Sequence, residues 1–182
     1  MRPFLFAALA FALSVPASAA LAPGAKAPDF TAAGAVAGKP ISVSLKAALK
    51  KGPVVLYFFP AAFTAGCNAE AHAFAEALPD FTAAGATVIG MTAGNVDQLE
   101  KFSSEYCAGK FAVAAATPAV IKGYDVLLKK PDGSTATITS RTSFVIAPSG
   151  KILSSHTDMS PASHIKQTLA EVRKYRKAHP RG

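Results

Sequence analysis

The sequence predicts one α/β domain with a mixed central sheet flanked by helices, and two observations carry this prediction. Three short apolar runs, 53–59, 86–93 and 111–116, alternate with segments whose apolar residues recur at helical spacing, which is the order of a partly parallel sheet. After residue 125 the pattern changes to alternating runs separated by Pro, Gly and Ser, which is typical of antiparallel hairpins. A chain of 182 residues, 51% of them hydrophobic, is long and apolar enough for a real core.

Residues 1–19 are predicted to be a signal peptide. Arg2 precedes an apolar run, and small residues in the A-x-A cleavage pattern end at Ala19, so cleavage is expected near that residue. The alternative is a membrane anchor, but the apolar run is too short to cross a bilayer. The domain proper would then be residues 20–182, periplasmic or secreted, in a compartment where disulfides form, and without stable membrane association.

The chain carries a formal net charge of +8, and part of this charge lies in the basic run 173–182. Such a run can bind nucleic acid. Export argues against that partner, and the plainer interpretation is a solvated helix end whose cations suit the negative end of the helix dipole. No nucleic-acid partner is therefore expected.

The first half of the domain is predicted to run from an extended lead-in to a long helix. The segment 22–30 is punctuated by Pro and Gly, and 39–49 holds a short strand and a turn of helix. The run 53–59 is bounded by prolines and reads as a buried central strand. Pro60 ends this strand, a loop follows, and a helix is expected over 65–77. The apolar stripe of this helix consists of Ala71, Phe74, Ala75 and Leu78.

The middle of the chain is predicted to contain two more strands and two helices. The run 86–93 is a second buried strand, and Asn95 is expected to cap a helix that Gly109 ends. The run 111–116 is a short strand, after which Pro118 opens a short helix or turn. The helix after Asn95 is indicated by the spacing of Val96, Leu99, Phe102 and Tyr106.

The last part is predicted to consist of hairpins and a final helix. Turn signals in 129–138 and 147–153 lie between alternating runs. Strands at 140–146 and 151–157 would be adjacent and antiparallel. An amphipathic helix is expected to start near Ser160, with Ile165, Leu169 and Val172 facing the core.

One of the two cysteines stands where a reactive thiol is expected. Cys67 lies in the first turn of the helix that follows a central strand, at the end of an α/β sheet where ligand sites gather. Unpaired N–H groups and the positive end of the helix dipole favour a thiolate there. Thr64 can donate its hydroxyl to the sulfur or to a bound oxygen, and Gly66 removes bulk beside the sulfur. Pro60 and Phe63 can exclude water from one side.

A cation beside the sulfur would complete such a site. Arg141 is the only arginine in the body of the domain. On the predicted strand, Arg141, Ser143 and Val145 share one face because side chains alternate. If this face meets the loop before Cys67, the guanidinium stabilises the thiolate further.

The segment 54–74 resembles the active-site segment of the peroxiredoxins, above all the branch of the bacterioferritin comigratory protein and peroxiredoxin Q. The family pattern P-x-x-x-T-x-x-C matches Pro60, Thr64 and Cys67. The stretch GAKAPDF resembles the family's entry to the domain, and RTSFVIAPSGKI resembles its arginine strand, which assigns the family's active-site arginine to Arg141.

The resemblance implies a thioredoxin-like fold and a thiol peroxidase. Cys67 would attack a peroxide and become a sulfenic acid, while Thr64, Arg141 and backbone N–H groups hold the peroxide oxygens. The family often places a glutamate at the position of Glu70 beside its arginine, although a solvated helix glutamate is the alternative. The resemblance also implies a thioredoxin-like dithiol reductant, a monomer, and neither a metal nor an organic cofactor.

The resemblance further suggests a role for the second cysteine. Some members of the branch carry a resolving cysteine five residues after the first, a position that is His72 here. Others carry it on the next helix, where this chain has Cys107, so an intrachain disulfide between Cys67 and Cys107 is expected during the cycle. A disulfide needs Cα atoms within about 7 Å, so the reduced thiols are expected to lie apart and local unwinding to bring them together. The alternatives are a permanent structural disulfide and a Cys107 that is only a small buried hydrophobe.

Two rival functions use the same fold. A periplasmic thiol–disulfide oxidoreductase usually needs C-x-x-C, and the residues three before and three after Cys67 are Thr64 and Glu70. A non-catalytic exported binding module would have no use for the combination of Thr64, Cys67 and Arg141. The sequence therefore favours peroxide reduction.

Overall fold

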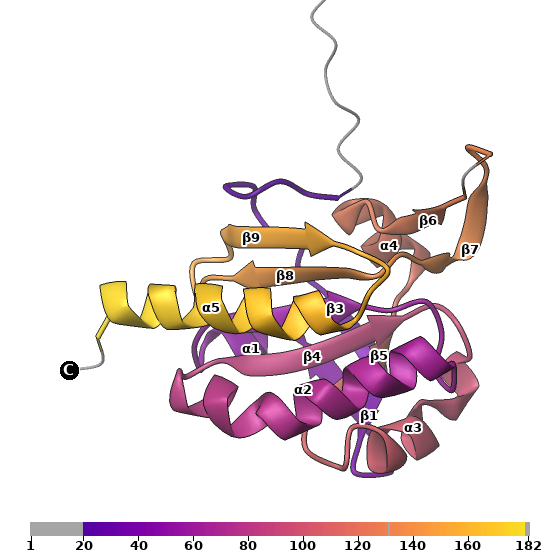
Figure 1. The fold of residues 1–182 in the computed structure, drawn as a ribbon, viewed down its shortest axis with the longest axis horizontal. Coiled ribbons are helices and arrows are strands. Elements are labelled where there is room, and N and C mark those ends of the chain that lie inside the picture. The colour runs from indigo at the N-terminus through magenta and orange to yellow at the C-terminus, as the bar shows by residue number, and fades with distance from the viewer. Residues whose placement is uncertain (1–19, 131, 181–182) are drawn as a thin grey trace, which may run out of the picture.

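The protein is built around one seven-stranded mixed sheet (Figure 1). The computed structural model describes residues 20–130 and 132–180, so the predicted signal peptide at 1–19 lies outside the described residues. The strand order is β2-β1-β5-β4-β3-β8-β9. In chain order the strands are β1 (Thr31–Val36), β2 (Lys39–Ser44), β3 (Val54–Phe58), β4 (Thr87–Thr92), β5 (Ala112–Ala115), β8 (Thr142–Ile146) and β9 (Ile152–Thr157).

The centre of the sheet confirms the three apolar runs as strands. β3 pairs with β4 and β4 with β5, all parallel, while β8 and β9 add on antiparallel at one side and β1 and β2 at the other. Every residue of β3 and of β8 is buried, because helices cover both faces of the sheet here. The predicted mixed α/β architecture is thus the observed one.

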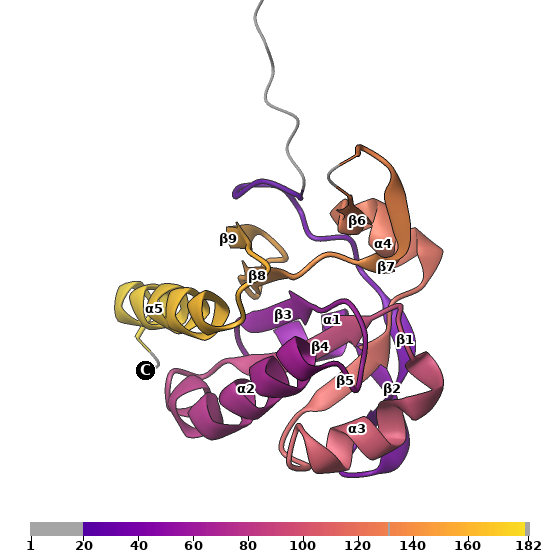
Figure 2. The ribbon, with the colours of Figure 1, turned by 45° about the vertical axis from the view of Figure 1, so that its right-hand side comes forward.

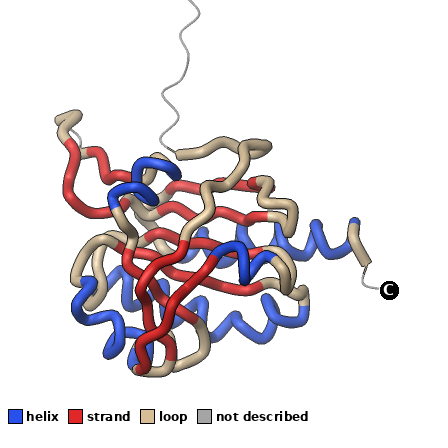
Figure 3. Tube along the Cα trace, turned by 180° about the vertical axis from the view of Figure 1, so that it is seen from behind, coloured by secondary structure: helices blue, strands red, loops and turns tan. Residues whose placement is uncertain are grey.

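Helices lie on both sides of this sheet. α2 (Ala65–Ala83), α3 (Leu99–Glu105) and α5 (Ala162–Ala178) pack on one face, where Figures 1 and 2 show α5 beside α2. The view from behind shows α1 (Leu45–Leu49) and α4 (Pro118–Tyr124) over the other face (Figure 3). No helix in the described ranges is both long enough and apolar enough to span a membrane.

Alternation along β3 divides the core into two layers. Val54, Leu56 and Phe58 belong to the layer under α1 and α4, whereas Val55 and Tyr57 belong to the layer under α2, α3 and α5. The second layer also contains both cysteines. The chemistry suggested by the sequence is therefore embedded in the core beneath α2.

The predicted hairpins are present. β8 and β9 pair antiparallel around the turn that holds Gly150. The other hairpin forms a separate two-stranded sheet of β6 (Leu127–Lys129) and β7 (Thr135–Thr139), which projects from the domain beside α4 (Figure 1). Pro118 opens α4 as expected, and the Thr117 hydroxyl caps that helix by accepting from the N–H of Val120.

The strand β1 was not predicted, because four of the six residues in its sequence TAAGAV are alanine or glycine, which are depleted in strands. The segment nevertheless forms a strand because of its contact with the neighbouring strand β5. A Cβ on Gly34 would come within 2.3 Å of the carbonyl oxygen of Val113 on β5, so the backbones approach closely where β1 joins the sheet. Here glycine marks a close approach of two strands rather than a loop.

The helix α2 is longer than predicted, because it continues through Pro79 to Ala83. Proline lacks an N–H, so a proline inside a helix leaves the carbonyl four residues earlier without its usual donor. The ammonium of Lys110 donates to that carbonyl, on Ala75, at 3.1 Å. A donor from a distant segment thus compensates for the missing hydrogen bond.

Asn95 stands at a helix start as predicted, but the element that it caps is a short 3₁₀ helix and its side chain makes no capping hydrogen bond. Asn95 has a left-handed backbone with φ 55°, makes no side-chain cap, and precedes a short 3₁₀ helix (Val96–Gln98) that leads into α3. Its side-chain amide instead donates to the carbonyl of Ala62 at 2.7 Å. Asn95 thereby holds the loop before α2.

Candidate active site

Cys67 lies in the first turn of α2, at the carboxyl end of β3. β3 ends at Phe58, the loop 60–64 follows, and α2 begins at Ala65. The Cys67 side chain is only 1% exposed, so the sulfur sits near the unpaired N–H groups of a helix start with little competing water. This is the placement that the sequence predicted.

Arg141 is the cation beside the sulfur. It directly precedes β8, and its Nη2 lies 3.6 Å from the Cys67 Sγ. Its Nε donates to the carbonyl oxygen of Met159 at 3.0 Å. A Cβ on Gly66 would stand 3.1 Å from Nη2, so the glycine leaves room for the guanidinium beside the sulfur. The structure therefore brings together two residues whose contact the sequence left as a condition.

Glu70 completes a buried charge cluster. Its carboxylate is fully buried, and Oε2 forms an ion pair with Arg141 Nη1. Burial raises the pKa of the Glu70 carboxyl, and the Arg141 guanidinium opposes that rise. The other oxygen, Oε1, has no hydrogen-bond partner among the described residues. Of the two interpretations left open by the sequence, the structure supports contact with the arginine and excludes a solvated glutamate.

Thr64 differs from its predicted orientation. It is the N-cap residue of α2 and is exposed, and its hydroxyl donates to the carbonyl of Ala61 at 3.0 Å rather than to the sulfur. The hydroxyl prefers this neighbouring acceptor because a short side chain at a helix start competes for local backbone groups.

The loop before α2 is held by β4. The Thr92 hydroxyl at the end of β4 donates to the carbonyl of Pro60 at 3.0 Å, next to the Asn95 contact on Ala62. Phe63 sits in this loop with φ 61°. Sequence reasoning missed Thr92 and Asn95 as supports, because hydrogen bonds to loop carbonyls leave no pattern in the sequence.

Cys107 follows α3 and is fully buried, and both cysteines are free thiols in this structure. A permanent disulfide is therefore not present here. Burial raises the pKa of the Cys107 thiol. Aromatic rings pack between the two cysteine-bearing segments, because Phe63 contacts Phe102 and Tyr106 edge-on, with centroids 5.6 and 5.5 Å apart.

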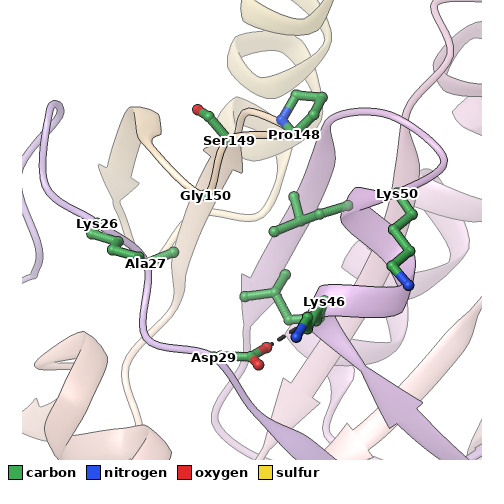
Figure 4. A pocket seen from close by; sticks show the side chains of 10 residues that line it. Lys26, Ala27, Asp29, Lys46, Lys50, Pro148, Ser149 and Gly150 are labelled. Atoms are coloured by element: carbon green, nitrogen blue, oxygen red, sulfur yellow. Dashed lines mark hydrogen bonds between the residues drawn. The ribbon is translucent and has the colours of Figure 1, made fainter.

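Other candidate residues lie away from the sulfur. His72 is 62% exposed and pairs with Glu76 at 3.3 Å. A depression of about 440 Å³ is lined by Lys26, Lys46 and Lys50 together with the β8–β9 turn (Figure 4). It lies near the start of β3, at the opposite end of the sheet from Cys67, and does not belong to this site. In the described part of the chain no three His, Cys, Asp or Glu side chains gather as metal ligands would.

His164 on α5 is fully buried behind β8, a residue that the sequence could not tell from a surface histidine. Burial, and after it the nearby positive charges, lower its pKa from 6.5 to about 4, although the Asp158 carbonyl opposes this. Between about pH 4 and pH 6.5, His164 is therefore protonated in the unfolded chain but neutral in the folded protein. The contribution of His164 to the free energy of unfolding is expected to be fully present above pH 6.5 and to be lost as the pH drops towards about 4.

This expectation is checked by urea unfolding at about pH 7.5 and about pH 4.5. Because other groups also titrate in that interval, the wild type is compared with His164→Gln, which carries no titrating ring. The loss of stability on acidification should be smaller in the variant. Equal losses in the two proteins would show that His164 does not contribute.

Comparison with known proteins identifies the family to which this chain belongs. The model of the AhpC/TSA family matches residues 23–155. Among curated proteins, peroxiredoxin Bcp of Xanthomonas campestris is 26% identical over 125 residues, covering 68% of this chain and 78% of the relative. The chloroplastic peroxiredoxin Q of Sedum lineare is 30% identical over 133 residues, covering 72% of this chain and 68% of the relative.

Solved structures give the same family. Peroxidoxin BcpB of Mycobacterium tuberculosis superposes with a TM-score of 0.73 at 27% identity, covering 85% of this chain and 97% of the other. Peroxiredoxin Q of Xanthomonas campestris, at 24% identity, shares the fold with a TM-score of 0.67, covering 82% of this chain and 91% of the other. The chain therefore belongs to the AhpC/TSA family, in the branch of the bacterioferritin comigratory protein and peroxiredoxin Q, and is a thiol peroxidase of the peroxiredoxin class.

Proposed function

We propose that this protein reduces peroxides through a sulfenic acid on Cys67, which Cys107 then resolves as an intrachain disulfide. The observation that carries the proposal is the Arg141 guanidinium, 3.6 Å from a buried sulfur in the first turn of a helix. The Cys67 thiolate attacks the terminal peroxide oxygen, the O–O bond breaks, and the leaving alkoxide or hydroxide takes a proton to become an alcohol or water. The peroxide is thereby reduced by two electrons and the sulfur oxidised by two.

Arg141 and the N–H groups at the start of α2 supply the electrostatics of this step. Charge moves from the sulfur to the leaving oxygen in the transition state, and fixed donors in a dry site stabilise it there. Thr64 is proposed to hold a bound peroxide oxygen after its hydroxyl turns away from the Ala61 carbonyl. Pro60 is proposed to shield the site from bulk water, at the start of a loop whose geometry Thr92 fixes.

The substrates are proposed to include hydrogen peroxide and alkyl hydroperoxides. Two apolar side chains near the site reach solvent: Met159, which is 54% exposed, follows the strand beside Arg141, and Phe63 is half-buried in the loop before Cys67. They offer an apolar approach for an alkyl chain. The bacterioferritin comigratory protein of Xanthomonas campestris, which shares the fold at a TM-score of 0.67 and 23% identity, is described as having alkyl peroxide reduction activity.

Resolution by Cys107 requires rearrangement of both cysteine-bearing segments. Cys107 lies in a turn just after α3, and its backbone N–H still donates to the carbonyl of Phe102 at 3.3 Å. Positive φ angles at Ala108 and Gly109 show that this turn is tightly wound. The disulfide forms when the sulfenic oxygen leaves as water, so the sulfurs must come within bonding distance while the Phe63 and Phe102 rings separate.

Replacement of Cys107 by serine is expected to leave the first peroxide reduction intact and to stop the cycle after one turnover. The variant keeps Cys67, Arg141 and Glu70, so sulfenic acid forms at the wild-type rate, but nothing resolves it. Stopped-flow assays with one equivalent of hydrogen peroxide give the rate. Intact-mass spectrometry then identifies the product. The disulfide of the wild type is ~2 Da lighter than the reduced protein because two hydrogens are lost, whereas the sulfenic acid of the variant is trapped by dimedone.

Two outcomes would contradict parts of this proposal. Multiple turnovers in Cys107→Ser with a dithiol reductant would remove Cys107 from the cycle, since the reductant would then act on the sulfenic acid itself. A wild-type disulfide between two chains would replace the intrachain pairing. The proposed reductant is a thioredoxin-like dithiol, and the proposed working form is a monomer, which sedimentation of the reduced protein tests.

We also propose that residues 1–19 direct export and that the protein works in the periplasm or outside the cell. The support is the charged, apolar and small-residue order of this segment, which ends at Ala19. N-terminal sequencing of the protein recovered from a periplasmic extract tests it. A protein that retains Met1 and stays with the cytoplasmic fraction would contradict it.

A further inference from the structure

A buried chain of hydrogen bonds connects α5 with the segment that holds Arg141. The Ser143 hydroxyl on β8 lies 2.7 Å from Nδ1 of His164, and Nε2 of the same ring lies 2.8 Å from the carbonyl oxygen of Asp158. His164 is 0% exposed, and Ser143 is 1% exposed. Both ring nitrogens are therefore engaged inside the core.

The partners fix the tautomer of His164. A carbonyl oxygen can only accept, so Nε2 must carry the hydrogen that points to Asp158. Nδ1 is then the acceptor, and the Ser143 hydroxyl donates to it. Burial lowers the pKa of His164 to about 4, so the neutral ring and this tautomer persist at neutral pH.

The segment reached by His164 is the one that clamps the arginine. The carbonyl next in the chain, on Met159, accepts from Arg141 Nε at 3.0 Å. The Asp158 N–H donates back to the Arg141 carbonyl at 3.3 Å. The Asp158 carboxylate closes the turn by accepting from the Ser160 N–H at 2.8 Å. The segment 158–160 thus contacts both the main chain and the side chain of Arg141.

We propose that His164 is a positioning residue for peroxide reduction: by holding the Asp158 carbonyl it fixes the Met159 carbonyl and so aims the guanidinium at the Cys67 sulfur. His164 does not touch the reacting atoms. Its role is to keep the arginine fork in the plane from which Nη2 reaches Sγ while Nη1 meets Glu70. The inference rests on the proposed function, because it says which residue orients the arginine of that same active site.

A small change in the orientation of the Arg141 guanidinium is enough to lower the rate of peroxide reduction measurably. The guanidinium is planar and has three partners in different directions: a sulfur, a carboxylate and a carbonyl. If the carbonyl of Met159 moves, the plane tilts and the donor to the transition-state oxygen is misplaced. Misplacement of a catalytic group by about 1 Å costs up to about 10²-fold in rate.

Two conservative variants separate positioning from simple core packing. The amide nitrogen of glutamine lies where Nε2 of histidine does, so His164→Gln keeps the donor to Asp158. The shorter His164→Asn keeps a polar group near Ser143 but cannot reach the Asp158 carbonyl. Both introduce an amide into the same buried space, so a difference between them reports the Asp158 contact rather than the loss of the ring.

The readout is the second-order rate constant for hydrogen peroxide beside that for iodoacetamide. Alkylation needs an accessible thiolate but no arginine to stabilise a leaving oxygen. We expect His164→Asn to react about 10-fold more slowly with peroxide while alkylation changes less than about 2-fold, and His164→Gln to react within about 3-fold of the wild type. His179→Gln is the matched control, because His179 follows α5 and its ring contacts Tyr175 of that helix rather than the segment 158–160; its peroxide rate should not change.

The outcomes are distinguishable. If the wild type does not reduce peroxide, the proposed function fails. If it does, and His164→Asn matches it, the positioning role is refuted. Equal losses in the peroxide and alkylation rates would show only a damaged site and would also refute it. Should His164→Asn not fold, His164→Leu decides, because leucine fills buried space without any donor to the Asp158 carbonyl; an unchanged peroxide rate in that variant would refute the inference.

Discussion

Replacement of Cys67 by serine is expected to abolish peroxide reduction to the level of the buffer blank. The thiolate is the nucleophile, and a serine hydroxyl at neutral pH is neither ionised nor polarisable enough to attack the O–O bond. Only one heavy atom changes, at a site that is 1% exposed, so the fold is expected to remain. Stopped-flow consumption of hydrogen peroxide by the reduced variant measures the loss.

Cys107→Ser is the matched control for this result. It makes the same chemical change at the other buried cysteine, yet it should retain one full turnover. Peroxide consumption by Cys67→Ser would move the nucleophile to Cys107 and contradict the proposed order of events. Circular dichroism of both variants separates a missing nucleophile from a missing fold.

The features that the sequence predicted well are those set by local chemistry. The run 53–59 is apolar, rich in β-branched and aromatic residues and bounded by prolines, and it forms β3, in which every residue is buried. Cys67 follows from it, since a loop and a helix after a central strand place the helix start at the sheet's carboxyl end. Arg141 was predictable in part: the sequence offered it as the one cation in the body of the domain, but neither its place just before β8 nor its distance from Cys67 follows from local pattern.

The features that the sequence did not predict depend on distant contacts. β1 is a strand because Gly34 lets its backbone approach β5, and no local propensity encodes that approach. The sequence left the surroundings of Glu70 open between a contact with the arginine and solvent, because its partner Arg141 lies 71 residues later in the chain, just before β8. The Thr64 hydroxyl found a nearer acceptor than the sulfur. The role inferred for His164 depends on a carbonyl of the segment 158–160, and backbone acceptors carry no residue signature.

Replacement of Arg141 by lysine is expected to slow the oxidation of Cys67 by about 10²–10³-fold, the cost of losing one donor to a developing oxyanion. Lysine keeps the positive charge, but a single ammonium cannot meet the Cys67 sulfur, the Glu70 carboxylate and the Met159 carbonyl from one point. Lysine is preferred to leucine here because leucine would leave Glu70 buried without a partner, at a cost of about 3–5 kcal/mol to stability. The second-order rate constant for hydrogen peroxide is the measured quantity.

Arg173→Lys provides the control for this prediction. Arg173 pairs with Asp80 at 3.3 Å on the surface, where both side chains are 58% exposed, so the same substitution there should leave the peroxide rate unchanged. If Arg141 acted through its positive charge alone, lysine would support the same peroxide rate. If it acts through the directed hydrogen bonds of its guanidinium, lysine would not. An Arg141→Lys variant that reacts within about 3-fold of the wild type would mean that positive charge suffices and that the directed hydrogen bonds of the guanidinium contribute little to catalysis. A loss of the expected size, with the iodoacetamide rate little changed, would show that the geometry of the fork stabilises the departing oxygen.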